Sequence, residues 1–254
     1  MFKPKKHTMK KITLTLLFAA YLLAAFAQYS WSNKQDFTGS ARYEPSTFVL
    51  NGKGYMIGGR TSSSPITYVN ENWQYDPSTD SWTAKANFPY AVAANQGFSI
   101  NGKGYIVGGQ DNGFNYLSAT YEYDANNNTW TQKASAPVNL SGTFTFVVNN
   151  IAYLGCGART GSNNSITVYA YNPSTNSWAS KANYIGPSVV GPVGFSIGNF
   201  GYAGGGTNGS GTLNNQFYKY DPTTDSWSTI AAFPGKPRVG AFAFVQNGKA
   251  YVGG

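Results

Sequence analysis

The chain has 254 residues, with 18 Lys and Arg against 10 Asp and Glu, a formal net charge of +8. Five of the lysines and none of the acids precede Gln28, so the remainder carries a net charge of only +3 (18 − 5 − 10). Its basic residues are scattered singly, which gives no reason to expect a nucleic-acid partner. Low charge with abundant Gly, Tyr, Phe and Asn favours short strands and tight turns over helices.

Residues 1–27 have the layout of a secretory signal peptide. A lysine-rich start is followed by an apolar run from Ile12 that ends in the small-x-small sequence Ala25-Phe26-Ala27. The run is shorter than the about 20 residues that span a bilayer, so we predict cleavage near Gln28. We expect a secreted protein (extracellular, periplasmic or at the cell surface) with no stable membrane insertion after cleavage.

Histidine and cysteine are nearly absent. The one histidine, His7, lies in the predicted signal peptide, and the one cysteine is Cys156. An intrachain disulfide is therefore impossible, and residues 28–254 lack the histidines that Ser-His or Cys-His catalysis and His-based zinc sites need. We expect no metal site and no cofactor.

Residues 28–254 are built from an internal repeat. A glycine-rich string contains the tyrosines Tyr55, Tyr105, Tyr153, Tyr202 and Tyr251, spaced 50, 48, 49 and 49 residues apart. A phenylalanine stands seven residues before each of them: Phe48, Phe98, Phe146, Phe195 and Phe244. A second string alternates with the first: YDPSTDSW (75–82), YDANNNTW (123–130), YNPSTNSW (171–178) and YDPTTDSW (220–227). A repeat of this length indicates a propeller or a solenoid.

Each repeat predicts four strands, a to d. Strand a carries the phenylalanine among small residues, and an Asn-Gly turn typical of hairpins leads to a short apolar strand b that ends in Gly-Gly. Strand c alternates aromatic residues, and a turn rich in Asp, Pro and Ser leads to strand d with its tryptophan. One such sheet cannot cover its own apolar faces, whereas sheets packed around a ring can.

The repeats set the expected boundaries. Four full units fall at about 42–86, 91–134, 140–182 and 189–231, and a partial unit occupies 239–254. Trp31 is in register with Trp82, so residues 28–38 are predicted to form an isolated strand d.

The Gly-Gly doublets with a preceding tyrosine and the spaced Tyr and Trp resemble kelch repeats over essentially all of 28–254. The resemblance implies an all-β propeller of four-stranded antiparallel blades, with strand d of residues 28–38 as the closing strand. It also implies that about five of six blades are present and that the chain is truncated at its C-terminal side.

The connections differ in variability. The a–b and c–d turns are nearly identical between repeats, while the b–c and d–a connections differ each time and should emerge together on the opposite face. Variable loops on a rigid scaffold are where binding usually occurs. The candidate ligand-binding residues on that face are Arg42, Tyr43, Arg60, Asp111, Phe114, Tyr116, Arg159 and Arg238.

Arg42 and Arg238 occupy the same repeat position, where other blades have valine or leucine. In a closed ring they could clamp a carboxylate or an acidic sugar, because a guanidinium donates two parallel hydrogen bonds; they could equally be ordinary exposed loop arginines. Glu44 is a candidate general acid or base, or simply a solvated residue.

Three functions remain open. The first is a monomeric binding module for a carbohydrate or protein ligand. The second is a metal-independent sugar isomerase, because the chain is similar to secreted bacterial kelch proteins of the N-acetylneuraminate mutarotase/epimerase type. It also resembles the galactose oxidase propeller, but that family's copper ligands include histidines, which residues 28–254 lack. The third is a structural or adhesive part of a larger surface protein.

Overall fold

The computed structural model describes residues 32–61, 65–160 and 164–254. The predicted signal peptide and Trp31 lie outside the described residues. The described residues form strands and turns and contain no helix, which confirms the all-β prediction. A search of this described part for a helix long and apolar enough to cross a membrane finds none.

Residues 36–254 form one compact unit, in which four sheets of four antiparallel strands follow one another along the chain. The first contains β2 (Ser46–Leu50), β3 (Lys53–Ile57), β5 (Asn72–Asp76) and β6 (Ser81–Lys85), and the second β7 (Gln96–Ile100), β8 (Lys103–Val107), β9 (Thr120–Asp124) and β10 (Thr129–Lys133). The third contains β11 (Phe144–Val148), β12 (Ile151–Gly155), β13 (Val168–Asn172) and β14 (Ser177–Lys181), and the fourth β15 (Val193–Ile197), β16 (Phe200–Gly204), β17 (Phe217–Asp221) and β18 (Ser226–Thr229). A two-stranded sheet of β19 (Phe242–Gln246) and β20 (Lys249–Gly253) follows them. A small sheet of β1 (Arg42–Tyr43) and β4 (Arg60–Thr61) lies beside the first four-stranded sheet, which we number blade 1.

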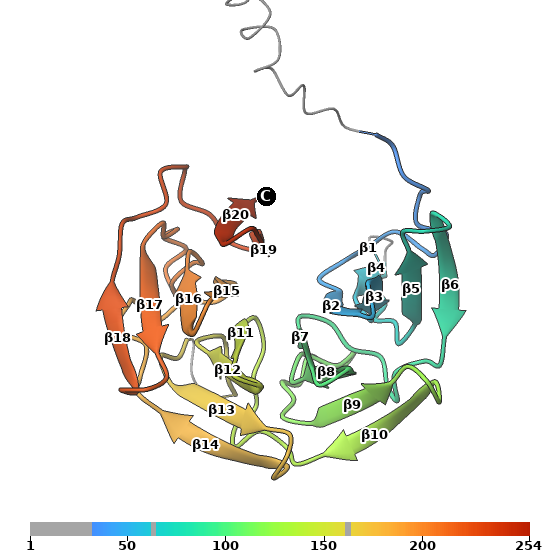
Figure 1. Ribbon diagram of the computed structural model, residues 1–254, viewed down its shortest axis with the longest axis horizontal. Coiled ribbons are helices and arrows are strands. Elements are labelled where there is room, and N and C mark those ends of the chain that lie inside the picture. The colour runs from blue at the N-terminus through green and yellow to red at the C-terminus, as the bar shows by residue number, and fades with distance from the viewer. Residues whose placement is uncertain (1–31, 62–64, 161–163) are drawn as a thin grey trace, which may run out of the picture. The chain divides into compact units, whose positions relative to one another are not determined.

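These sheets are the blades of a propeller, and the first strand of each blade lies innermost (Figure 1). The inner strands touch in the order β2, β7, β11, β15, β19. Within the described chain β19 makes no contact with β2, so blade 1 and the β19–β20 hairpin are not neighbours.

Aromatic side chains hold successive blades together. Phe48 of β2 stacks on Tyr55 of β3, and this pair packs against Tyr123 and Trp130 of the next blade, with Tyr55 and Tyr123 ring centroids 5.5 Å apart. The same four positions meet between blades 3 and 4. The spaced Phe, Tyr and Trp of the sequence are therefore the interblade core.

The Gly-Gly doublets mark places where the next blade comes too close for a side chain. A Cβ at Gly58 would lie 2.3 Å from the Val92 carbonyl oxygen, and one at Gly108 would lie 2.4 Å from that of Leu140. Both glycines also have a positive φ, which most other residues rarely adopt. This confirms the close backbone approach predicted from the sequence.

A polar contact repeats between neighbouring blades, where the c–d turn of one blade meets the end of strand d of the preceding blade. The Asn128 side-chain oxygen accepts hydrogen bonds from the Tyr123 hydroxyl of its own blade and from the Ala86 N–H of the preceding one. Trp130 donates its indole N–H to the carbonyl of the same Ala86. Asn176 and Asp225 make the corresponding contacts in blades 3 and 4.

On the variable-loop face, the residue two positions before each strand a joins a belt of backbone hydrogen bonds. Ala94 donates its N–H to the Glu44 carbonyl, Gly142 to Ala94, Gly191 to Gly142 and Gly240 to Gly191, at 2.8–3.1 Å. All five residues have a positive φ. This peptide belt links the inner strands of the four blades and of the β19–β20 hairpin.

The inner strands also alternate in side-chain size. Blades 1 and 3 have Thr47 and Thr145 where blades 2 and 4 have Gly97 and Gly194. A Cβ at Gly97 would lie 2.4 Å from the Thr47 carbonyl oxygen, and one at Gly194 would lie 2.6 Å from that of Thr145. Glycine thus allows the first two blades, and the next two, to approach closely as pairs.

The structure differs from expectation at the N-terminal side of blade 1. Residues 32–38, the described part of the predicted isolated strand d, form no strand. A closing strand d needs a strand c as its partner, and all four strands c of the described chain already pair with their own strands d. Phe37 instead packs its ring edge against Trp73 and Trp82, at 5.5 and 5.0 Å.

Candidate functional site

Four of the predicted residues come together where the variable loops of blades 1 and 2 meet. The Arg60 guanidinium lies over the rings of Tyr43 of β1 and Tyr68 of the b–c loop, with its central carbon 5.1 and 5.4 Å from their centroids. Glu44 forms an ion pair with Arg60. Phe114 of the next b–c loop packs its ring against Tyr68 at 6.1 Å.

Hydrogen bonds connect these residues across the two blades. Arg60 donates to the Tyr68 hydroxyl, which donates to the Gln110 side-chain oxygen at 2.8 Å. Gln110 in turn donates its side-chain N–H to the Phe114 carbonyl. The cluster of Tyr43, Glu44, Arg60, Tyr68, Gln110 and Phe114, here named the blade 1–2 cluster, is therefore preorganised.

Charges within the blade 1–2 cluster neutralise each other. Burial disfavours the charged guanidinium of Arg60, but its hydrogen bond and ion pair with Glu44 outweigh burial and raise its pKa above the usual value. Burial also raises the pKa of the Tyr68 hydroxyl, against the opposing effect of Arg60. Arg60 is thus a charged residue whose charge is already paired.

Asp111 builds the loop that presents Phe114. Its carboxylate accepts hydrogen bonds from the backbone N–H groups of Gly113 and Asn115 at 2.8 and 2.9 Å, and from the Asn115 side chain. The N–H of Asn115 is the main cause that lowers the pKa of Asp111. Phe114 sits at the loop tip with a φ of 62° and is 65% exposed. Asp111 therefore fixes the shape of the loop, and Phe114 is the exposed side chain that this loop presents.

Arg42 does not form the predicted anion clamp. Its side chain is 2% exposed, and it donates to Glu71 at 2.5 Å and to the Gly58 carbonyl at 3.2 Å. Its guanidinium also covers the ring of Phe37, 5.0 Å from the centroid. A buried arginine with a carboxylate partner is part of the scaffold and is not available to a ligand.

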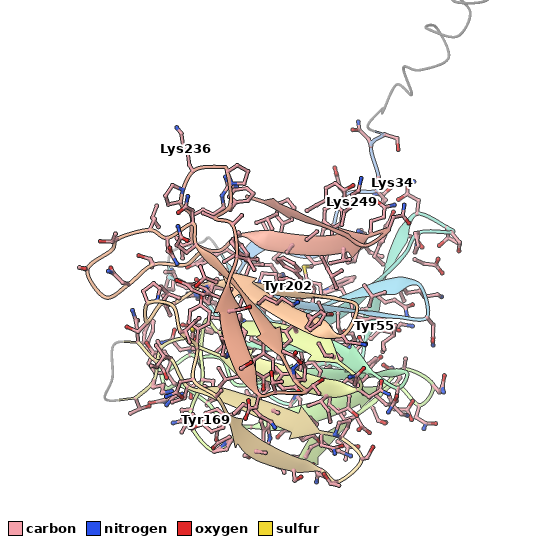
Figure 2. All side chains as sticks on the ribbon, turned by 60° about the vertical axis from the view of Figure 1, so that its left-hand side comes forward. Lys34, Tyr55, Tyr169, Tyr202, Lys236 and Lys249 are labelled. Atoms are coloured by element: carbon pink, nitrogen blue, oxygen red, sulfur yellow. The ribbon has the colours of Figure 1, made fainter. Side chains whose placement is uncertain are left out.

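Arg238 repeats the geometry of Arg42 in its own blade. Its Nε donates to the carbonyl two residues earlier, its Nη1 donates to Gly254, and its guanidinium lies over Phe233 at 4.8 Å. The neighbouring Lys236 points away from the blades (Figure 2). Because β19 and β2 do not touch, the structure does not bring Arg238 to Arg42.

The remaining predicted residues lie apart or serve the loops. Tyr116 is half-buried and pairs with Gln110 through a single backbone bridge. Arg159 lies in blade 3, over the ring of Tyr169 at 5.8 Å, and two of its guanidinium nitrogens are buried without a hydrogen-bond partner in the described chain.

Cys156 occupies the first position of a Gly-Gly doublet, with a φ of 61°. It is fully buried, and burial raises the pKa of its thiol to about 12, so it is not a reactive thiolate. In the described part of the chain no three His, Cys, Asp or Glu side chains gather as a metal-binding group.

Sequence reasoning missed Tyr68 and Gln110, the central members of the blade 1–2 cluster. Tyr68 lies outside the strict repeat, and Gln110 follows a Gly-Gly doublet as Arg60 does. In every blade the residue after the doublet lies at the base of the b–c loop. Gln110 could therefore have been predicted as a site residue, because it occupies the position that Arg60 has in blade 1.

The blades, the doublets and the interblade aromatic core define this protein as a kelch-type β-propeller. A sequence model of the Attractin/LZTR1 β-propeller matches residues 17–254, and the chain belongs to this family. No curated protein matches the sequence.

Solved structures agree with the fold. The structure titled "Structure of YjhT" superposes with a TM-score of 0.78 and covers 90% of this chain and 81% of that one. The sequences are 15% identical, so this likeness supports the propeller fold and no more.

Proposed function

We propose that this protein is a secreted binding module that holds a carbohydrate or protein ligand on its variable-loop face, at the blade 1–2 cluster. The observation that carries the proposal is Phe114, a 65% exposed aromatic ring at the tip of a loop fixed by Asp111. An exposed aromatic side chain held in place loses little entropy on binding, which suits it as an anchor.

The rest of the cluster supports the same role. Tyr43 and the stacked Arg60 extend the surface from Phe114 through the buried Tyr68. Because the Arg60 charge is balanced by Glu44, the site favours a ligand without a strong negative charge. This differs from the acidic ligand expected for the two-arginine clamp.

The experiment is a screen of glycans and of proteins, followed by hydrogen exchange on each hit with the full chain. The ligand should protect the loops around 60–61 and 110–116, and Phe114→Ala should weaken binding at least tenfold. Asn126→Ser, in a turn on the opposite face, is the control and should leave affinity unchanged. Protection confined to the opposite turns would contradict the proposal.

The secretion proposal rests on the signal-peptide layout alone. Exported protein should begin at or near Gln28, as read by N-terminal sequencing. An exported protein that retains residues before Tyr21 would contradict it.

Glu44 favours a second candidate, a sugar isomerase of the mutarotase type. It adopts a φ of 56° where three other blades have glycine, and its side chain is 41% exposed beside Arg60. Residues held in such a conformation cluster at functional sites. Turnover of a sugar anomer that Glu44→Gln abolishes while binding persists would establish this candidate over simple binding.

A further inference from the structure

Arg159 differs from the other arginines of the chain because it has no hydrogen-bond or ion-pair partner among the described residues. Arg42, Arg60 and Arg238 each donate to a carboxylate or to a backbone carbonyl. The Nε and Nη2 atoms of Arg159 are buried, yet neither finds an acceptor in the part of the chain that the structure describes. Buried donors in proteins are nearly always paired, so this unpaired edge indicates an acceptor that the described chain does not supply.

The two unpaired atoms of Arg159 lie on the same edge of the guanidinium. Nη1 is on the side of Cδ, so the N–H bonds of Nε and Nη2 point in the same direction as two parallel donors. Such a pair matches the two oxygens of a carboxylate, or two oxygens of a phosphate or sulfate group, in a bidentate contact. A neutral hydroxyl or carbonyl offers one oxygen and no charge. The unpaired edge is therefore the one best matched to an oxyanion.

The repeat position of Arg159 holds a hydrogen-bond acceptor in the neighbouring blades. Asp111 in blade 2 and Asn208 in blade 4 occupy it, two residues after the Gly-Gly doublet. Each accepts hydrogen bonds from backbone N–H groups of its own b–c loop. A guanidinium has only donors and cannot close a loop in this way. Arg159 therefore does not have the structural role that this position has in blades 2 and 4.

The charge distribution along the chain favours an anion at this position. Residues 125–220, which include all of blade 3, contain neither Asp nor Glu. The basic residues of the same stretch are Lys133, Arg159, Lys181 and Lys219. A region with basic side chains and no carboxylate of its own has a positive potential, which attracts anions. The charge of Arg159 is thus left for a ligand to neutralise.

We infer that Arg159 binds the oxyanion of a ligand, a carboxylate, phosphate or sulfate group, through its Nε and Nη2 atoms. The guanidinium lies over the ring of Tyr169 of β13 (labelled in Figure 2), with its central carbon 5.8 Å from the ring centroid. This is close to the limit of about 6 Å for a cation–π contact, so the contact is weak. The side chain can turn its unpaired edge toward an anion without breaking a hydrogen bond to the described chain. The site lies in blade 3, and the inference does not rest on the function proposed for the blade 1–2 cluster.

The test is NMR of the isotope-labelled full chain. Its four arginines give four Nε–H signals, and the signal lost in Arg159→Lys belongs to Arg159. Acetate, phosphate and sulfate are titrated separately against chloride at constant ionic strength. We expect the Arg159 signal to move saturably with at least one oxyanion and not with chloride, while the other three signals stay in place. Tighter binding of acetate indicates a carboxylate ligand, and tighter binding of phosphate or sulfate indicates a phosphorylated or sulfated one.

Two variants separate the donor pair from the charge. Arg159→Lys keeps the charge without the paired donors, and the backbone N–H signals of blade 3 should report about tenfold weaker oxyanion binding. Lys181→Gln, the matched control, removes a charge from the same blade and should change the affinity by less than about twofold.

An Arg159 signal that no oxyanion moves, or that chloride moves equally, overturns the inference. An equal loss of affinity in both variants also overturns it, because the attraction would then come from overall charge. Neither result bears on the blade 1–2 cluster, whose ligand screen tests the proposed function separately.

Discussion

At the residue scale, Arg42 and Arg238 have the same local geometry, but their surroundings differ. Each covers a phenylalanine five residues earlier and donates to a glycine carbonyl sixteen residues later. Arg42 adds an ion pair with Glu71, the residue before β5. Val92, Leu140 and Val189 fill the equivalent positions and are buried, so this position belongs to the core of each blade.

Arg42→Ala should destabilise the protein by about 1 to 2 kcal/mol. Charged hydrogen bonds contribute more than neutral ones, but solvent at the partly exposed Glu71 reduces the effect. Urea denaturation measures it, with Arg42→Leu as the control because leucine already stands at this position in blade 3. An Arg42→Ala protein of wild-type stability would show that the buried ion pair contributes nothing.

The same ion pair predicts a pH dependence. The Trp73 indole N–H is the main cause that lowers the pKa of Glu71 from 4.5, with Arg42 adding to it and burial opposing it. A carboxylate with a depressed pKa stabilises the fold above its ordinary pKa and loses that contribution as pH falls through the depressed value.

Wild type should therefore lose stability relative to Glu71→Gln when pH falls below about 4.5. Unfolding free energies of both proteins, measured near neutral pH and again in acid, provide the comparison. An identical loss in both proteins would exclude Glu71 as a source of acid sensitivity.

At the scale of elements, one asparagine connects two blades. Asn128 accepts from Tyr123 and from Ala86 of the preceding blade while holding a φ of 52°. Asp225 does the same in blade 4. Both residues have a short side chain with an oxygen that accepts hydrogen bonds, and both tolerate a left-handed backbone conformation.

Asn128→Ala should cost about 2 to 4 kcal/mol, because two donors lose their acceptor and alanine is strained in this conformation. Asn128→Asp should change stability by less than about 1 kcal/mol, since both hydrogen bonds can still form. Thermal and chemical denaturation measure both. If the two variants are equally destabilised, the interblade hydrogen bonds are not the cause.

Repeated positions made these elements predictable from the sequence. The spacing of Phe48 and Tyr55 located strands a and b in every blade, and the Gly-Gly doublets located the close approaches between blades. The blade 1–2 cluster was predicted only in part, because Tyr68 and Gln110 act through contacts between loops that share no repeat. Arg42 was misjudged because its partner, Glu71, lies 29 residues away and outside the aligned motif.

At the scale of the whole molecule, the alternation of Thr and Gly on the inner strands groups the blades in pairs. Gly97→Ala should destabilise by about 1 to 3 kcal/mol, because its Cβ would lie 2.4 Å from the Thr47 carbonyl oxygen. The control is Ala243→Gly at the equivalent position of β19, which should cost at most about 1 kcal/mol. Equal effects, measured by urea denaturation, would show that the pairing has no energetic basis.

The peptide belt affects which positions of such a protein can change during evolution. The peptide belt, which begins at Glu44 and ends at Gly240, lies at the innermost positions of the variable-loop face. Its backbone N–H and C=O groups form hydrogen bonds between neighbouring blades. A ligand near the axis therefore meets side chains and few free backbone groups. Under the proposed binding function, specificity at these innermost positions would therefore depend on side chains, which substitution can change without altering the backbone belt.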